Sequence, residues 1–325
     1  MNHAGIIQSR FRLRSLSSIM ESKRTRRLAM LQATFAVIVW GASFIATKIA
    51  LKELSPMEVI ILRFGIGTAT VALFVFLRKE FSRIAGKDFL FVLLLGFLGI
   101  AFHQWLQSTG LQTAEATTTA WIITTIPVFI LILGKIFLKE RTPLVSVTGI
   151  ILAAVGVLLI VSKGEVGNIL RGTFGKSGDF LILMSALNWA VFSILSRKSL
   201  RRHASTNLML HVLFLGWMMT CVAGFGTSLL HHQPIFSQMA TLSIEGTSSI
   251  LFLGLLCSGF AYIFWYDALK HLPATQVGVF LYVEPLIAMI VAYILLDEQM
   301  TMIALLGGGL ILLGVYLVNK KPAED

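Results

Sequence analysis

The residues of this chain best suited to chemistry are ionisable side chains inside long apolar stretches. Glu284 stands beside Pro285 near the middle of one such stretch, residues 274–298. A charged carboxylate is costly at the centre of a bilayer, so an acid there is a candidate for function. Burial favours the protonated form of a carboxyl group and a nearby cation favours the charged form. A residue held between these two influences can couple proton movement to another process. The alternative is a glutamic acid permanently hydrogen-bonded to a neighbouring helix.

Arg63 and His103 lie inside the second and third apolar stretches. Arg63 is a candidate to bind an acidic group, or else it pairs internally and extends its charged end toward the membrane surface. His103 is either a proton relay or a hydrogen-bonded histidine of the core. Lys135 lies within one turn of a helix end, where we expect it to extend toward the surface.

Polar and aromatic residues recur at helical spacing in six of the apolar stretches. Such side chains have little reason to face lipid, so they should face protein or water. Each stripe alone is compatible with helix packing, whereas six stripes drawn from both halves of the chain favour a central cavity. The stripes are Trp40, Ser43 and Thr47; Gly99, His103, Gln107 and Gly110; Thr117, Trp121 and Thr124; Ser185, Asn188, Trp189 and Phe192; Ser258, Tyr262 and Trp265; and Gln276, Phe280 and Glu284. The candidate substrate-binding residues are Trp40, Ser43, Arg63, His103, Gln107, Trp121, Asn188, Trp189, Tyr262, Trp265, Phe280 and Glu284.

Pro127 and Pro285 fall inside predicted helices, and each removes one helical hydrogen bond. We expect each to bend its helix and expose carbonyl groups near the membrane midplane. Glu140 and Glu298 stand at helix boundaries, which favours capping or gating contacts over substrate contacts. No metal site or cofactor is expected, because Cys221 and Cys257 lie in separate apolar stretches without metal-ligand spacing.

The composition requires elements that can hold these side chains in a membrane. Hydrophobic residues make up 56% of the chain and charged residues 13%, against about 45–50% and 25% in soluble domains. A spanning helix needs about 20 mostly apolar residues. The fold class is therefore an all-α polytopic membrane protein with ten transmembrane helices. They are predicted at 31–51, 57–77, 88–109, 116–138, 143–162, 178–197, 208–230, 248–269, 275–296 and 301–318.

The basic residues support this number of helices. If the N-terminus is cytoplasmic, twenty Lys and Arg residues fall in the inner segments and five in the outer ones. That distribution obeys the positive-inside rule and predicts that both termini are cytoplasmic. The formal charge of +11 is spread over these loops and forms no single patch, so it indicates topology and no nucleic-acid partner.

An internal duplication relates the two halves of the chain. Residues 274–298 match residues 116–140 at an offset of 158, and the register holds without a gap from Gly96 and Gly254 to Gly156 and Gly314. Five helices per half is an odd number, so the halves must enter the membrane in opposite directions. We therefore predict two inverted five-helix repeats, a pattern typical of secondary transporters with a site near the midplane.

The matched positions resemble the EamA family of the drug/metabolite transporter superfamily. In the first copy they are Trp40-Gly41, Arg63, Gly110-Leu111, Ala116, Pro127 and Glu140. In the second they are Asn188-Trp189-Ala190, Ser196-Arg197, Ala268-Leu269, Ala274, Glu284-Pro285 and Glu298. The resemblance covers about residues 30–319. It implies ten helices around a central cavity, with both termini inside, and the transport of small metabolites, commonly exported amino acids or their derivatives.

The chain divides into five segments on this interpretation. Met20 opens a run that looks like a natural start, so we expect residues 1–19 to be dispensable. The segments are a basic cytoplasmic tail (1–29), a first EamA repeat (30–162), a linker (163–177), a second EamA repeat (178–319) and a cytoplasmic tail (320–325).

The predicted function is secondary-active transport of a small metabolite or drug-like amphiphilic solute across the cell (inner) membrane, with export as the expected direction. Its partners would be the solute, the lipid bilayer and protons, with the oligomeric state left open. One alternative is a nucleotide-sugar or sugar-phosphate exchanger of the same superfamily, although the second repeat places no cation inside its helices. A membrane-embedded enzyme is a further alternative, but HExxH and GxSxG motifs are absent from the sequence.

Overall fold

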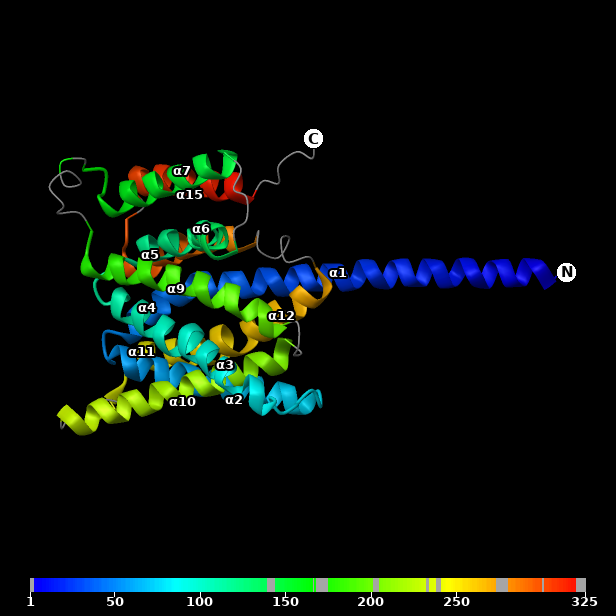
Figure 1. The fold of residues 1–325 in the computed structure, drawn as a ribbon, viewed down its shortest axis with the longest axis horizontal. Coiled ribbons are helices and arrows are strands. Elements are labelled where there is room, and N and C mark those ends of the chain that lie inside the picture. Colours follow the sequence, from blue (N-terminus) through cyan, green and yellow to red (C-terminus); the bar gives the residue numbers. More distant parts are fainter. Residues whose placement is uncertain are drawn as a thin grey trace.

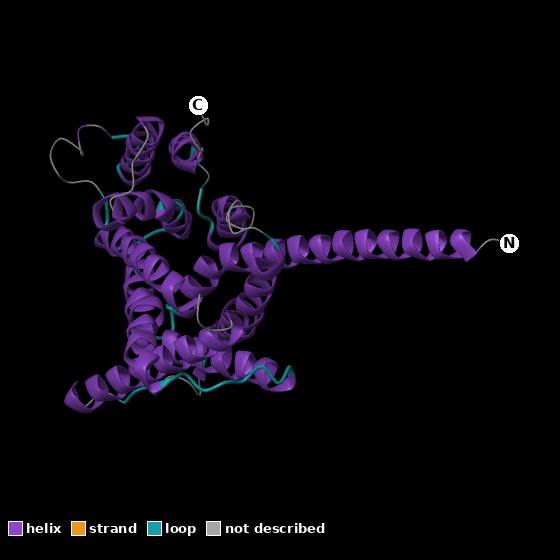
Figure 2. Ribbon diagram, turned by 45° about the vertical axis from the view of Figure 1, so that its right-hand side comes forward, coloured by secondary structure: helices purple, strands orange, loops and turns teal. Residues whose placement is uncertain are grey.

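A computed structural model of the chain describes residues 3–138, 144–165, 167, 175–200, 205–231, 234–237, 241–272, 280–299 and 301–319. Over these residues the fold is helical and contains no strand (Figure 2). The first half comprises α1 (His3–Ala50), α2 (Pro56–Leu77), α3 (Gly86–Gly96), the π-helix η1 (Phe97–Phe102), α4 (His103–Leu111), α5 (Ala116–Ile123), α6 (Ile126–Leu138) and α7 (Leu144–Val161). The second half comprises α9 (Ser177–Leu200), α10 (Ser205–His231), α11 (Ile244–Leu251), the π-helix η3 (Phe252–Phe260), α12 (Ala261–His271), the 3₁₀-helix η4 (Leu281–Val283), α14 (Glu284–Leu296) and α15 (Met302–Asn319).

The described helices give a multi-pass membrane protein. Six spans are long and apolar enough to cross a membrane: Arg24–Ala50, Pro56–Leu77, Gly86–Leu111, Ser177–Ser196, Thr206–Leu230 and Ile244–Ala268. Four shorter apolar helices occupy Ala116–Ile130, Val147–Val161, Leu281–Leu296 and Met302–Leu317. Each predicted segment overlaps one of these helices. That all ten cross the membrane stays a prediction.

The first helix is longer than the sequence analysis predicts. α1 begins at His3, and its N-terminal part extends beyond the helix bundle (Figure 1). Neither glycine nor proline occurs from Ile6 to Trp40, so no residue in that stretch interrupts a helix once it has formed. Whether residues 1–19 are dispensable stays a prediction.

The duplication is confirmed by the bounds of the helices. η1 and η3 end at Phe102 and Phe260, and α6 and α14 begin at Ile126 and Glu284. The same offset of 158 residues separates the start of α3 from that of α11, the end of α6 from that of α14, and both ends of α7 from those of α15. The repeated sequence therefore forms the same elements twice.

Each half packs mainly against the other half. α1 contacts α11, η3 and α12, and α9 makes the equivalent contacts with α3, η1 and α4. α2 packs on η3, and α10 packs on α3 and η1. α7 and α15 lie together at one edge of the bundle (Figure 1). The contacts of one half thus recur, with the roles exchanged, in the other.

The loops gather at two ends of the bundle. At the end where α1 terminates, which we name the Glu298 end, the carboxylate of Glu53 accepts hydrogen bonds from the backbone N–H and the hydroxyl of Ser243. At the opposite end, named the Arg78 end, Arg78 pairs with Asp267 at 3.0 Å. α1 ends and α9 begins at the Glu298 end, so these two helices run in opposite directions (Figure 1).

Each predicted proline stands at the start of a regular α-helix. α5 ends at Ile123 and α6 begins at Ile126, so Pro127 is the second residue of a new helix. Pro285 is likewise the second residue of α14, after a short 3₁₀ turn. A proline in the first helical turn needs no N–H donor and clashes with no earlier carbonyl. Inside a helix it loses a hydrogen bond and its ring clashes with the carbonyl four residues earlier.

Two π-helices were not predicted from the sequence. η1 interrupts the third predicted helix and η3 the eighth, at equivalent places in the two halves. A π-helix shifts the hydrogen-bonding partner by one residue and often marks a functional position. Helical spacing read from the sequence cannot reveal such a shift.

Candidate functional site

An aromatic cluster joins α1 to α12. The ring of Trp40 lies 5.5 Å from that of Tyr262 and 5.1 Å from that of Trp265. The indole Nε1 of Trp40 donates a hydrogen bond of 3.0 Å to the carbonyl of Cys257 in η3. Ser43, one turn further along α1, is buried and donates to the carbonyl of Trp40. These contacts place the predicted stripe of α1 against the predicted stripe of η3 and α12.

A second cluster joins α4 to α9 in the equivalent way. The ring of His103 lies 4.7 Å from that of Trp189, and its Nδ1 is 3.1 Å from the carbonyl of Ser185. The amide Nδ2 of Asn188 donates a hydrogen bond of 2.6 Å to the carbonyl of Leu98 in η1. Each π-helix therefore accepts a side-chain N–H from the helix that crosses it from the other half. This contact fits the alternative of a hydrogen-bonded core histidine, and the alternative of a proton relay stays a prediction.

Close helix packing surrounds this second cluster. A Cβ atom at Gly99 would lie 2.6 Å from the ring of Phe192, and one at Gly110 would lie 2.8 Å from the side chain of Ile182. Gln107 is buried on α4 between His103 and Gly110. The stripe predicted for the third helix thus faces α9, and glycine lets the two helices approach.

Arg63 bridges the two halves between these clusters. Its Nε donates a hydrogen bond of 2.8 Å to Ser258 Oγ in η3, and its Nη1 lies 3.4 Å from Gln104 Oε1 in α4. Only 5% of Arg63 is exposed. Gln104 was not among the predicted site residues, because it lies off the stripe that passes through His103. Its position beside His103 is the one signal in the sequence that could have indicated it.

Glu284 begins α14 and is buried. Its carbonyl oxygen would lie 2.9 Å from a Cβ atom at Gly41, so α14 and α1 are in close contact beside Trp40. No described residue forms a hydrogen bond or an ion pair with its carboxyl group. The permanent hydrogen bond that the sequence analysis weighed as the alternative is not seen among the described residues.

Two of the predicted residues lie apart from these clusters. Trp121 is fully buried in a separate apolar cluster, where its ring packs against Gly308 of α15. Phe280 lies outside the ring contacts described above and packs against an apolar cluster that includes Ala33 of α1 and Ala268 of α12. The predictions for Lys135, Glu140 and Gln276 concern side chains outside those that the structure describes.

Glu298, from the second half of the chain, caps the start of α5 in the first half. Its carboxylate accepts hydrogen bonds from the backbone N–H of Ala116 at 2.9 Å and of Thr117 at 3.1 Å, and from the hydroxyl of Thr117 at 2.9 Å. Lys48 Nζ lies 3.2 Å from the same carboxylate and donates to the carbonyl of Ala114. An anion at a helix N-terminus satisfies free N–H groups and the helix dipole. We call these contacts the Glu298 cap, and they confirm the predicted capping role of Glu298.

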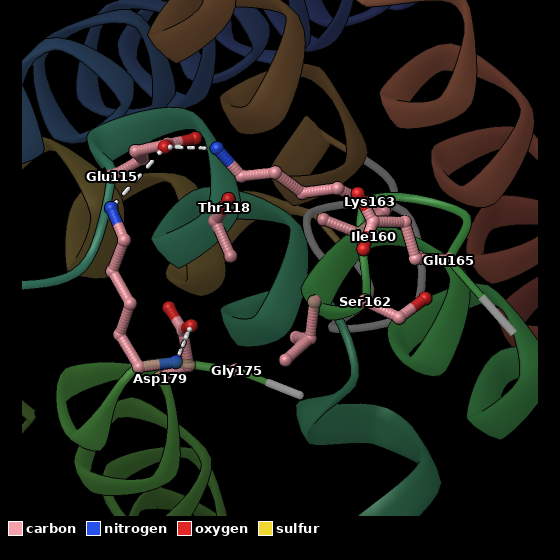
Figure 3. Close-up of a pocket in the computed structure, with 10 residues that line it drawn as sticks. Glu115, Thr118, Ile160, Ser162, Lys163, Glu165, Gly175 and Asp179 are labelled. Carbon is pink, nitrogen blue, oxygen red and sulfur yellow. Dashed lines mark hydrogen bonds and ion pairs between the residues drawn. The ribbon is translucent and has the colours of Figure 1, made fainter. Parts of the chain in front are cut away.

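A small polar cavity of about 180 Å³ lies at the same end (Figure 3). Lys163 and Lys176 approach Glu115 from two sides, at 2.9 and 3.3 Å. Burial acts to raise the pKa of Glu115, but the hydrogen bonds and charges of the two lysines outweigh it, and the pKa is lowered from its usual 4.5. A second cavity, of about 540 Å³, lies between the start of α2 and the C-terminal part of α10. None of the predicted substrate-binding residues lines either cavity.

Comparison with known proteins settles the family. The EamA-like transporter family matches residues 27–162 and again residues 176–320. The chain belongs to the EamA-like transporter family. The resemblance noted from Trp40, Pro127, Glu284 and Glu298 is therefore confirmed, together with the two repeats.

Several relatives cover almost the whole chain. An uncharacterized transporter of Archaeoglobus fulgidus is 30% identical over 288 residues, which are 89% of this chain and 96% of the relative. A probable terminal-alkyne amino-acid exporter of Streptantibioticus cattleyicolor is 25% identical over 285 residues, covering 88% and 91% of the two chains. A solved crystal structure, 18% identical, covers 90% of this chain and 96% of its own with a TM-score of 0.63, which shows likeness of fold. As a member of this family, the EamA protein described here is a membrane transporter of a small solute.

Proposed function

We propose that this EamA protein is a secondary-active exporter of a small amphiphilic metabolite such as an amino acid, and that it works by alternating access. The exchange of packing roles between the two halves supports ten spanning helices arranged as two inverted five-helix repeats. Such a pair of halves can rock about a site at their interface. Arg63, which bonds to both α4 and η3, lies at that interface.

The observation that carries this proposal is the Glu298 cap. Glu298 of the second half caps the N-terminus of α5 in the first half, at one end of the bundle. With the N-terminus in the cytoplasm, as the basic residues predict, the Glu298 end faces outside. The conformation described is then closed to the outside. Residues 163–177 and 231–245 would be extracellular and both termini cytoplasmic, in an inner membrane. Cysteine labelling of intact cells tests this topology at residues 78–88, which should be protected.

The proposed substrate class follows from the buried groups. Trp40, Tyr262 and Trp265 offer apolar surface, while Arg63 offers a positive charge and Glu284 an ionisable carboxyl group. A relative that carries the name of a probable amino-acid exporter supports the same class. A sugar-phosphate exchanger would need several buried cations, and Arg63 is the only Arg or Lys in the buried set among the described side chains.

Counterflow in proteoliposomes tests the function. Purified protein is reconstituted with a panel of unlabelled L-amino acids inside, and uptake of the same labelled amino acid is followed from outside. A carrier predicts saturable uptake that the internal solute accelerates. Uptake that is linear in concentration and indifferent to the internal solute would contradict alternating access. Empty liposomes serve as the control.

A further inference from the structure

Arg63 is a buried cation whose described partners are all neutral. Ser258 and Gln104 accept hydrogen bonds from Nε and Nη1, and no described residue forms an ion pair with the guanidinium group. The adjacent ring of Phe64 lies 5.1 Å from Cζ. Burying an isolated charge is costly unless an opposite charge accompanies it. The structure therefore holds a positive charge for which it supplies no carboxylate.

The hydrogen-bonding capacity of Arg63 is also incomplete. A guanidinium group carries five N–H donors, and the described partners of Arg63 use one on Nε and one on Nη1. The remaining face, which includes Nη2, has no acceptor among the described residues. A planar oxyanion fits a free guanidinium face in a bidentate manner.

We propose that Arg63 binds the carboxylate group of the transported solute, with Ser258 and Gln104 holding the guanidinium group in place. This assignment rests on the proposed transport function. Ser258 fixes the Nε side, which leaves the Nη edge for the solute. A carboxylate carries the single negative charge that one arginine balances. A phosphate dianion would bring a second charge that no other buried Arg or Lys in the described part of the chain can neutralise.

The position of Arg63 suits a group that responds to solute. Gln104 belongs to α4 of the first half and Ser258 to η3 of the second, while Arg63 itself extends from α2. A Cβ atom at Gly67, one turn after Arg63, would lie 2.5 Å from the side chain of Ser258, so α2 and η3 are in close contact here. A carboxylate on Arg63 thus binds where the two halves meet.

The test compares solutes that differ only in the carboxylate. From the panel of L-amino acids, the one with the highest counterflow rate is compared with its primary amide, its decarboxylated amine and glucose 6-phosphate as competitors. For the wild-type protein, we expect the amino acid to compete at a concentration about 10- to 100-fold lower than its amide, the effect of one charge-assisted interaction. In Arg63→Gln, the amino acid and its amide should compete equally.

Variants separate binding from folding. Arg63→Lys keeps the charge and should retain part of the preference, whereas Ser258→Ala should weaken competition by the amino acid while leaving that by the amide unchanged. Arg78→Gln, the same substitution in an ion pair just after the end of α2, is the matched control and should leave the preference intact. If Arg63→Gln does not fold, Arg63→Lys and Ser258→Ala decide the question by the same ratio.

The outcomes distinguish this inference from the proposed function. If wild-type protein moves amino acids but does not distinguish them from their amides, or if Arg63→Gln keeps the preference, the carboxylate assignment is overturned and transport stands. Better competition by glucose 6-phosphate than by any amino acid overturns it in favour of a phosphate site. If no solute of the panel shows counterflow in the wild-type protein, the proposed function fails and the assignment fails with it.

Discussion

At the scale of single residues, the buried polar side chains of this EamA protein are of two kinds. Some hydrogen-bond to a neighbouring helix, and others are ionisable groups without an oppositely charged partner among the described residues. Trp40, Asn188 and His103 each find a backbone carbonyl, so much of the predicted stripe pattern is accounted for by helix contacts. Arg63 and Glu284 remain buried without a charged partner among the described residues. Sequence alone located both groups, because an ionisable residue in an apolar stretch is conspicuous. The sequence could not show whether either residue has a charged partner, since the neighbours that would supply one are distant in the chain.

Glu284 is the residue we expect to couple transport to protons. Glu284→Gln keeps the shape of the side chain and removes its titration. The variant should insert and fold normally, while the dependence of the transport rate on pH disappears. Counterflow and gradient-driven transport measured across a pH series check this. An unchanged rate and pH profile would make Glu284 structural.

Glu115 predicts a dependence of stability on pH. Its pKa is lowered in the folded protein, chiefly because Lys163 and Lys176 outweigh the opposing effect of burial. A carboxylate of this kind contributes stability above its unfolded-state pKa, and the contribution is lost as pH falls through the lower folded-state value. The melting temperature of Glu115→Gln should therefore approach that of the wild type as the solution is acidified below 4.5. A difference that stays constant across this range would show that the ion pairs contribute nothing.

At the scale of elements, the sequence predicted ten helical segments and a disturbance at each of two prolines, but it did not predict the π-helices. Apolar length located them, and the offset of 158 residues located their repetition. The π-helices η1 and η3 could not be predicted, because a hydropathy pattern reports burial and not hydrogen-bond register. The pairing of Lys48 with Glu298 joins residues 250 positions apart and could not be read from either neighbourhood.

The pairing of α7 with α15 depends on small residues. A Cβ atom at Gly307 would lie 2.9 Å from the carbonyl oxygen of Gly156, whereas one at Gly309 would meet nothing within 4 Å. Gly307→Ala should therefore force the helices apart and cost about 1–3 kcal/mol of stability. Gly309→Ala, two residues away on the same helix, is the control and should be neutral or mildly stabilising. Equal thermal stability of the two variants in detergent would show that close approach is unimportant.

The Glu298 cap should control access from its end of the bundle. Glu298→Ala removes three hydrogen bonds to the start of α5 and the ion pair with Lys48. We expect a severalfold faster reaction of the fully buried Cys257 with a membrane-impermeant thiol reagent added at the Glu298 end, measured with Cys221 replaced by serine. Glu245→Gln, at the same end of the bundle and outside the cap, is the control. Unchanged labelling would mean that the cap stabilises α5 without controlling access.

At the scale of the whole molecule, the protein is a bundle of two interlocking halves. The family and the repeats follow from sequence, and the packing shows how α1 and α9 take equivalent places on opposite partners. The direction of transport and the site depend on conformations that a sequence does not specify. We expect the Glu298 end of the bundle to open and close once in each transport cycle.

Reversible cross-linking of that end tests the claim most directly. Cysteines replace Lys48 and Glu298 in protein that lacks Cys221 and Cys257, and a short, reducible, thiol-reactive cross-linker joins them in proteoliposomes. We expect counterflow of the transported amino acid to stop on cross-linking and to return on reduction. Each single-cysteine variant should stay active throughout. Counterflow that continues at its full rate in the cross-linked protein would contradict alternating access through this end.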